Sequence, residues 1–292
     1  MKAMRPDGSY TVEKARAEGP SRRVPLLVLR PKREGPPGPG VLWLHGGGYF
    51  LGMKEMVFVS RAAELPGRFG ATVVAPGYRL AFQSPYPAAL EDGYAALLWM
   101  RRNAAALGIR EDQLMVGGES AGGGLAAAVC MLARDRGEVA VAFQMPLYPM
   151  LDCCDTVSSR DNRGKVWNTC RNHFGWRMYL RGTMGPEASP YASPARQTDY
   201  RGLPPCYTFV GDGEPFYAET LRYAEDLRAA GIPAEADVYP TDVHAFDMLR
   251  PDQPMSRAAA ERFNERFARA AVECFAAQPG PERSVGERRL QI

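Results

Sequence analysis

A serine between two glycines, at residues 118–122, is the feature that most constrains the fold of this chain. The segment reads Gly-Glu-Ser-Ala-Gly, with Ser120 at its centre. An apolar run at residues 113–117 precedes it and predicts a buried strand, and helix formers follow it up to Leu132. A serine on such a strand-to-helix turn projects its hydroxyl above the end of a sheet, beside the positive end of the helix. In a chain with 30 glycines this motif also arises by chance, so its meaning depends on the rest of the chain.

A second glycine-rich segment, His45-Gly46-Gly47-Gly48, follows another apolar run at residues 41–44. Successive glycines after a strand expose backbone N–H groups, which can converge on a developing oxyanion. Together with the N–H of Ala121, the residue after the serine, they predict an oxyanion hole. The alternative for an isolated run of glycines is a flexible turn. The position of this run, about one βαβ unit and a helix before Ser120, favours the oxyanion hole.

A nucleophilic serine needs a general base, and the chain contains only three histidines. His45 lies within the glycine loop, where we expect its ring to brace the loop. His173 lies in an irregular region, where a surface or packing role is expected. His244 follows the strand predicted at residues 235–239, which is where the base is expected in the order serine, acid, histidine. His244 is therefore the predicted base.

The base in turn needs a carboxylate to orient it, located between Ser120 and His244 in the chain. The strand predicted at residues 207–210 leads into a turn that offers Asp212 and Glu214. Asp242 is a weaker alternative, because it lies in the same short loop as His244, only two residues before it. Each of these carboxylates could instead serve as a turn or helix-capping residue.

Composition limits the remaining possibilities. The chain has 292 residues, of which 46% are hydrophobic and 24% charged, as in ordinary globular proteins that bury a sizeable core. The net charge of +3 predicts neither a nucleic-acid partner nor a membrane surface. We expect no signal peptide and no membrane span, because no apolar run is long enough. These features predict a cytoplasmic protein.

The six cysteines show no metal-ligand spacing, and we predict neither a metal nor another cofactor. Adjacent Cys153 and Cys154 could form a strained disulfide. Reduced thiols are the expectation for a cytoplasmic protein.

Apolar segments alternate with amphipathic ones, which predicts a mostly parallel central sheet with helices on both faces. Residues from about 151 to 200 break this alternation, and we interpret them as an insertion over the strand ends, where ligands bind in open parallel sheets. Further strands are expected at 24–30, 41–45, 71–75 and 139–145, and helices at 216–230, at about 255–276 and from Pro87 to before Gly108.

The residues that carry these patterns also carry a family resemblance. The chain resembles the hormone-sensitive-lipase-like branch of the α/β-hydrolases, in particular its small bacterial carboxylesterases. The match extends from about residue 40 to 250, in the order found in that family. The matching segments lie at residues 45–49, 77–81, 86–92, 118–123, 148–150, 189–194 and 244–247.

The resemblance implies a metal-free serine hydrolase that acts on carboxylic esters, usually with short acyl chains. It makes Ser120 the nucleophile, His244 the base, and the N–H groups of Gly47, Gly48 and Ala121 the oxyanion donors. The acid of the family is usually an Asp followed by Pro, and this chain has Glu214 followed by Pro215 in its place. The resemblance therefore favours Glu214 over Asp212, with a side chain one methylene longer.

The resemblance also implies a small cap. It assigns residues 24–150 and 196–292 to the α/β-hydrolase core, and residues 1–23 and 151–195 to a cap or lid. Three aromatic residues of the insertion are the candidate walls of an acyl pocket, with ordinary cap packing as the alternative: Trp167, Phe174 and Trp176.

The sequence thus predicts a serine carboxylesterase for a small-molecule ester. An amidase or deacylase that uses the same residues is the first alternative, and a non-catalytic small-molecule binder is the second. A prolyl-peptidase-like enzyme is disfavoured by the glycine-rich loop. A homodimer is left open.

Overall fold

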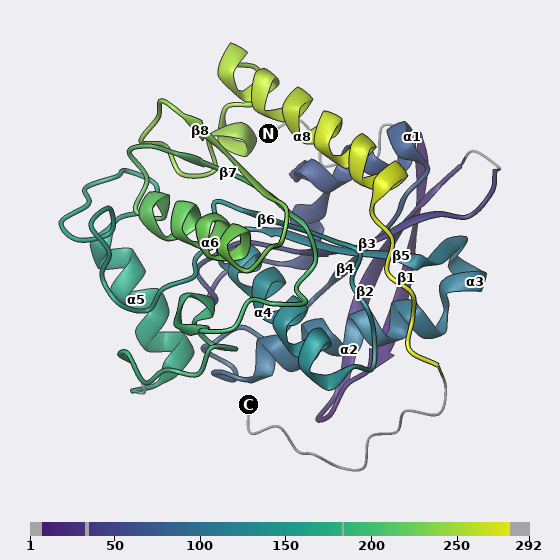
Figure 1. Ribbon diagram of the computed structural model, residues 1–292, viewed down its shortest axis with the longest axis horizontal. Helices are drawn as coiled ribbons and strands as arrows, with labels where there is room; N and C mark the ends of the chain where they lie inside the picture. The colour runs from purple at the N-terminus through teal and green to yellow at the C-terminus, as the bar shows by residue number, and fades with distance from the viewer. Residues whose placement is uncertain (1–7, 33–34, 183, 281–292) are drawn as a thin grey trace.

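One eight-stranded sheet runs through the protein, in the order β1-β2-β4-β3-β5-β6-β7-β8 (Figure 1). The computed structural model describes residues 8–32, 35–182 and 184–280. Strand β2 pairs antiparallel with β1 and with β4, and the remaining pairs are parallel. The strands are β1 (Tyr10–Glu18), β2 (Arg23–Pro31), β3 (Gly38–Leu44), β4 (Thr72–Pro76), β5 (Ile109–Glu119), β6 (Phe143–Leu147), β7 (Cys206–Gly211) and β8 (Ala234–Tyr239). The mostly parallel sheet predicted from the sequence is confirmed.

Helices cover both faces of the sheet (Figure 1). Because side chains alternate along a strand, Leu42 and Leu44 of β3 pack with the helices on one face, and Val41 and Trp43 pack with those on the other. Helices α2, α4 and α6 contribute to the first core, and α1 and α8 to the second. The helices are α1 (Leu65–Phe69), α2 (Ala88–Arg102), α3 (Ala104–Leu107), α4 (Ala121–Arg136), α5 (Thr169–Leu180), α6 (Tyr217–Ala229), α7 (Phe246–Leu249) and α8 (Pro254–Glu273), with short 3₁₀ turns at Lys54–Val59, Arg61–Glu64 and Pro194–Arg196.

The N-terminal segment corrects one expectation. Residues 1–23 were expected to belong to the cap, but Tyr10–Glu18 is strand β1, which pairs with β2 along its whole length. As an edge strand it exposes several charged side chains, among them Glu13 and Lys14, and these conceal the apolar alternation that identifies inner strands. Residues 1–7 of the predicted cap, like residues 281–292 of the predicted core, lie outside the described residues.

A second correction concerns the strand predicted at residues 139–145. The strand β6 is Phe143–Leu147, four residues later at its start. Val139 and Ala142 are buried, although they lie in the connection before the strand. The apolar side chains of this connection pack against the core, and for that reason the sequence pattern placed the start of the strand too early.

Residues 151–195 leave the core and return to nearly the same point. The hydroxyl of Ser193 donates to the carbonyl of Leu151 (2.9 Å), and so does the N–H of Ala195 (3.1 Å). Between these ends lies helix α5, at the left of Figure 1. The contacts between its two ends make this segment an excursion from the α/β core.

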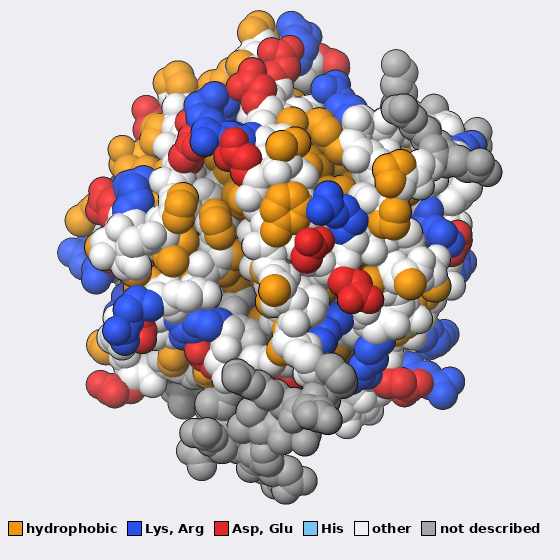
Figure 2. All heavy atoms as spheres, turned by 45° about the vertical axis from the view of Figure 1, so that its right-hand side comes forward, with side chains coloured by type: hydrophobic (Ala, Val, Ile, Leu, Met, Phe, Trp, Pro, Cys, Tyr) orange, Lys and Arg blue, Asp and Glu red, His pale blue; other side chains and the backbone are white. Residues whose placement is uncertain are grey.

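The surface carries both signs of charge. On the face shown in Figure 2, basic and acidic side chains are interspersed with apolar ones. This mixture accords with the small net charge of +3. None of the helices in the described part of the chain combines the length and the apolar character that crossing a membrane requires.

Candidate active site

Ser120 occupies a sharp turn between β5 and α4. Its backbone has φ 57° and ψ −121°, outside the regions that side chains ordinarily allow. The glycines on either side are required by close packing: a Cβ added at Gly118 would lie 2.4 Å from the Leu44 carbonyl oxygen, and one at Gly122 would lie 2.1 Å from it. Strand β3 therefore fixes the turn, which presents the Ser120 hydroxyl at the carboxyl end of the sheet.

The structure brings Ser120, His244 and Glu214 into one chain of hydrogen bonds. Nε2 of His244 lies 2.8 Å from Oγ of Ser120, and Nδ1 lies 2.5 Å from Oε2 of Glu214. His244 is in the loop after β8, and Glu214 is in the turn after β7. Ser120 is 6% exposed and His244 is 4% exposed. In this arrangement the imidazole can accept the serine proton, while the carboxylate holds its tautomer.

The turn after β7 explains why Glu214 reaches the histidine. Oε1 of Glu214 accepts the N–H of Gly211 (2.8 Å), which leaves Oε2 for His244. Burial raises the pKa of Glu214, and the nearby His244 imidazole and the Gly211 N–H oppose this rise. Asp212 is exposed and accepts the N–H of Thr241 instead (3.0 Å), and Asp242 is also exposed.

The glycine loop passes beside the nucleophile. A Cβ added at Gly46 would lie 3.3 Å from Cβ of Ser120. Gly47 has φ 120° and Gly48 has φ 59°, both in the region that favours glycine. The N–H of Ala121 belongs to the first residue of α4, so it has no acceptor within the helix. The backbone thus places the glycine loop beside the turn that carries Ser120 and the N–H of Ala121.

His45 stabilises the glycine loop through its ring. Its Nδ1 lies 2.8 Å from the Gly46 carbonyl oxygen, so this nitrogen carries the ring proton. Tyr78 stacks on the ring at 4.1 Å and donates its hydroxyl to the His45 carbonyl (2.7 Å). Burial lowers the pKa of His45 to about 4, so the ring is neutral at ordinary pH. His173, by contrast, forms an exposed pair with Asp155.

The three candidate pocket residues lie in different surroundings. The Trp167 ring lies 6.3 Å from His244, and it also contacts the glycine loop, since a Cβ at Gly48 would lie 2.2 Å from Cη2 of Trp167. Phe174 is 47% exposed, and packs edge-on against Phe50 of the loop. Trp176 is fully buried, so in this conformation it offers no surface to a substrate.

Four residues around the site have a positive φ although they are not glycine. They lie on four different segments that meet at Ser120 and His244. The residues are Tyr49, Ser120, Tyr148 and Ala245. Such conformations persist only where the surrounding packing imposes them.

A buried acidic network behind the site was missed by the sequence analysis. Glu119, directly before Ser120, accepts the indole N–H of Trp43 (2.9 Å). Asp247, three residues after His244, accepts the hydroxyl of Tyr148 (3.0 Å) and lies 3.1 Å from Nε of Arg61. Both acids lie within segments that carry the family resemblance, and this was the only sequence feature that could have indicated them. Their burial is not visible in a sequence.

The acid Glu119 makes stability depend on pH. Burial and the nearby Asp247 raise the pKa of Glu119 to about 8, from an ordinary value of 4.5. An acid that holds its proton more tightly when folded lowers the free energy of unfolding as pH rises between these two values. We expect the melting temperature to fall from pH 6 to pH 9 by roughly 5 °C less in Glu119→Gln than in the wild type. Calorimetry at both pH values measures this difference.

Glu111 provides the matched control, since it lies on the same strand and is exposed. Its replacement, Glu111→Gln, should leave the pH dependence of the wild type unchanged. Equal falls in melting temperature for the wild type and Glu119→Gln would contradict the assignment.

The order of these parts along the chain defines a class of protein. A nucleophile on a strand-to-helix turn, then a carboxylate and then a histidine after later strands is the arrangement of the α/β hydrolases. The chain belongs to this family, because the family model described as an alpha/beta hydrolase fold matches residues 41–248.

Similar proteins place the chain more narrowly. It is 33% identical to the carboxylesterase NlhH of Mycobacterium tuberculosis over 213 residues, which cover 71% of this chain and 66% of that protein. Among solved structures, a bacterial heroin esterase matches with a TM-score of 0.86 at 34% identity, covering 90% of this chain and 85% of the other. An esterase from Pyrobaculum calidifontis has a TM-score of 0.83 at 33% identity, with coverages of 90% and 84%.

These comparisons confirm the resemblance to the hormone-sensitive-lipase-like branch. The chain spans about two thirds of the length of the curated relatives that it matches.

Proposed function

We propose that this protein is a serine carboxylesterase that hydrolyses small esters through an acyl-enzyme on Ser120. The observation that carries the proposal is the hydrogen-bonded chain from Ser120 through His244 to Glu214. The names of the relatives support it, since they include carboxylesterases and a carboxylic ester hydrolase.

In the first step, His244 accepts the hydroxyl proton of Ser120 as the serine oxygen attacks the ester carbonyl. Negative charge develops on the carbonyl oxygen, and we assign the N–H groups of Gly47, Gly48 and Ala121 to its stabilisation. The Glu214 carboxylate stabilises the imidazolium that forms. His244 then returns the proton to the leaving alcohol, and the acyl group stays on Ser120.

In the second step, a water molecule attacks the acyl-enzyme. His244 accepts the proton of this water, and the same N–H groups stabilise the second tetrahedral intermediate. Collapse of that intermediate returns the proton to Ser120 and releases the carboxylic acid. Each step uses the one base and the one oxyanion site, so no metal is required by the mechanism.

We infer that residues 151–195 act as the cap and restrict the acyl group to a short chain. Helix α5 lies directly on the glycine loop, since a Cβ at Gly175 would be 2.9 Å from the Gly48 carbonyl oxygen. Trp167 fills the space beside His244. Two relatives, named ethyl acetate hydrolase and acetyl-hydrolase, are consistent with a small acyl group. A cytoplasmic location stays a prediction from the sequence, and a homodimer stays open.

A series of p-nitrophenyl esters tests the proposed function. We expect kcat/KM for the acetate and the butyrate to exceed that for the caprylate by about tenfold or more, because added methylenes meet Trp167. Trp167→Ala should reduce this preference, whereas Trp99→Ala on α2 should leave it unchanged. A flat profile in the wild type would contradict the short-chain assignment. Faster hydrolysis of the matching acetanilide than of the acetate would instead identify an amidase.

A further inference from the structure

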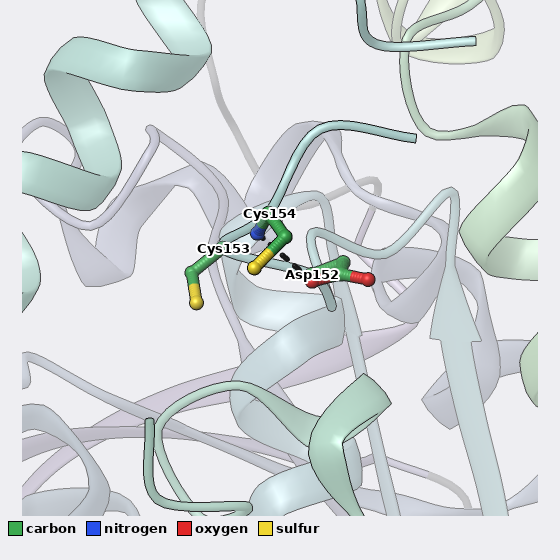
Figure 3. Close-up of side chains that lie close together, drawn as sticks. All are labelled: Asp152, Cys153 and Cys154. Carbon is green, nitrogen blue, oxygen red and sulfur yellow. Dashed lines mark hydrogen bonds between the residues drawn. The ribbon is translucent and has the colours of Figure 1, made fainter. Parts of the chain in front are cut away.

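Two adjacent cysteines, Cys153 and Cys154, lie at the start of the segment that leaves the core. Cys153 is buried and Cys154 is partly exposed, and both are free thiols. Their sulfur atoms and a carboxylate oxygen of Asp152 all lie within 4.8 Å of one another. Figure 3 shows the two sulfurs close together, with the Asp152 carboxylate on the opposite side of Cys154. A single thiophilic atom could therefore bridge the two cysteines with a small movement of their side chains.

The Asp152 carboxylate, the third group of this cluster, already has partners within the protein. Oδ1 of Asp152 accepts the backbone N–H of Cys154 (2.9 Å), and Oδ2 forms an ion pair with the guanidinium of Arg196. A divalent metal ion would have to compete with this guanidinium for the carboxylate. The cluster is thus better described as a pair of thiols than as a three-ligand metal site.

The surroundings also favour a neutral thiol at Cys154. Burial raises the pKa of Cys154 to about 11, and the adjacent Cys153 and Asp152 act in the same direction. A metal–thiolate complex requires both sulfurs to lose their protons and to carry charge in this place. A ligand that forms two covalent bonds to sulfur and leaves no charge avoids this cost.

We propose that the Cys153–Cys154 pair is a covalent capture site for monosubstituted trivalent arsenicals. In the reaction two S–H bonds and two As–OH bonds break, two S–As bonds form, and two water molecules leave. Arsenic stays trivalent throughout, so no oxidant or reductant is needed. The product is a neutral ring in which arsenic bridges the two sulfurs. Sulfur is a soft donor and trivalent arsenic a soft acceptor, so the two match in this chemistry.

The pair is connected to the candidate active site through a short stretch of main chain. The N–H of Met150 donates to the carbonyl of Ser120 (3.0 Å), and the hydroxyl of Tyr49, in the glycine loop, donates to the carbonyl of Met150 (3.0 Å). The N–H of Cys153 itself donates to the hydroxyl of Ser193 (3.0 Å). A ring closed between the two cysteines would constrain the main chain at Cys153. This residue lies three positions after Met150, which bonds to the Ser120 carbonyl.

A buried carboxylate holds the same stretch in place. Oε1 of Glu219, on α6, accepts the N–H groups of Leu151 (2.6 Å) and Asp152 (3.3 Å). Movement at the cysteines therefore disturbs the hydrogen bonds of Leu151 and Asp152, which lie between the cysteines and Met150. We expect capture to lower ester turnover by about tenfold or more, as small displacements at an active site do. This part of the inference rests on the proposed esterase function.

Intact-protein mass spectrometry with phenylarsine oxide tests the capture. The wild type should gain one arsenical per chain, which a dithiol removes and a monothiol leaves in place. Cys153→Ser and Cys154→Ser should each lose this dithiol-sensitive adduct. Cys170→Ser, at an exposed position in α5, should retain it. Cys206→Ser tests a second pair of neighbouring thiols, since Cys206 and Cys130 are both buried in the core and interact with each other, and it should also retain the adduct.

Hydrolysis of p-nitrophenyl acetate, followed before and after treatment, tests the connection to the site. Turnover should fall in the wild type, recover with the dithiol, and stay unchanged in Cys154→Ser. Capture that persists in either single variant would overturn the site. An adduct that leaves turnover unchanged would overturn the connection. A protein that is inactive before treatment would contradict the esterase function, while the mass measurement would still decide whether the thiols capture arsenic.

Discussion

Replacing Ser120 by alanine should lower the hydrolysis of p-nitrophenyl acetate by about 10⁴-fold or more. The hydroxyl is the atom that forms the acyl-enzyme, and no neighbouring group in the hydrogen-bonded chain can replace it. Loss of the serine in enzymes with this arrangement leaves only the weak catalysis given by binding and by the oxyanion site. The affinity for substrate should change much less than the turnover number. Steady-state kinetics with both proteins measures the two quantities separately.

Ser60→Ala supplies a matched control. Ser60 is also buried, but it caps the turn at Arg61–Glu64, where its Oγ accepts the N–H of Ala62 (3.1 Å). Its loss should cost about 1 kcal/mol of stability and leave turnover unchanged. A fluorophosphonate probe should label the wild type and Ser60→Ala, and leave Ser120→Ala unlabelled. Undiminished hydrolysis by Ser120→Ala would refute the proposed mechanism.

Replacing Glu214 by glutamine should lower kcat by about 10³- to 10⁴-fold. The buried carboxylate lies 2.5 Å from Nδ1 of His244 and fixes its proton on that nitrogen. A glutamine can present its amide N–H to the ring and stabilise the opposite tautomer, in which Nε2 carries the proton and cannot accept the serine proton. It also removes the negative charge that stabilises the imidazolium.

Asp212→Asn is the control for Glu214, because Asp212 lies two residues earlier in the same turn and binds the Thr241 backbone. This variant should keep turnover within a factor of about three of the wild type, as expected for an exposed position. Circular dichroism and melting temperature verify that both variants fold. Full turnover in Glu214→Gln, together with its loss in Asp212→Asn, would mean that the other carboxylate supports the histidine.

Strong local patterns made the inner part of the fold predictable. The strands at the centre of the sheet are buried on both faces, so they appear as uninterrupted apolar runs between turns. Strand β1 does not fit this description, since only Tyr10 and Ala17 are buried among its residues and most of its exposed side chains are charged. Its place is decided by pairing with β2, which is a contact between strands and leaves no separate pattern in the sequence.

The candidate site was predictable to the extent that each part follows a strand. Ser120 and His244 could be nominated because a motif marks the first and the scarcity of histidine marks the second. The carboxylate could not be chosen from spacing alone, because the direction of each side chain depends on how the turn after β7 folds. Burial of Trp176 and exposure of Phe174 likewise depend on the rotation of α5, which its sequence does not specify.

The buried carboxylates of Glu119 and Asp247 could not be predicted from the sequence, for a different reason. Glu119 is buried only because Trp43 and the segment bearing Asp247 close over it. These residues are far apart in the chain and come together through the sheet. A polar residue type usually indicates exposure, so sequence reasoning assigns such an acid to the surface unless its partners are known.

The four non-glycine residues with positive φ around the site set thermal stability against turnover there. Such conformations typically cost about 1–3 kcal/mol each, and the rest of the fold must offset that cost. A glycine at Tyr148 would relax the backbone but would remove a ring that packs against His244, and a glycine at Tyr49 would remove a ring that stacks on Tyr179. Selection for stability alone therefore works against activity at these positions. Evolution of a more heat-resistant form is better served by the outer helices, where no such conflict arises.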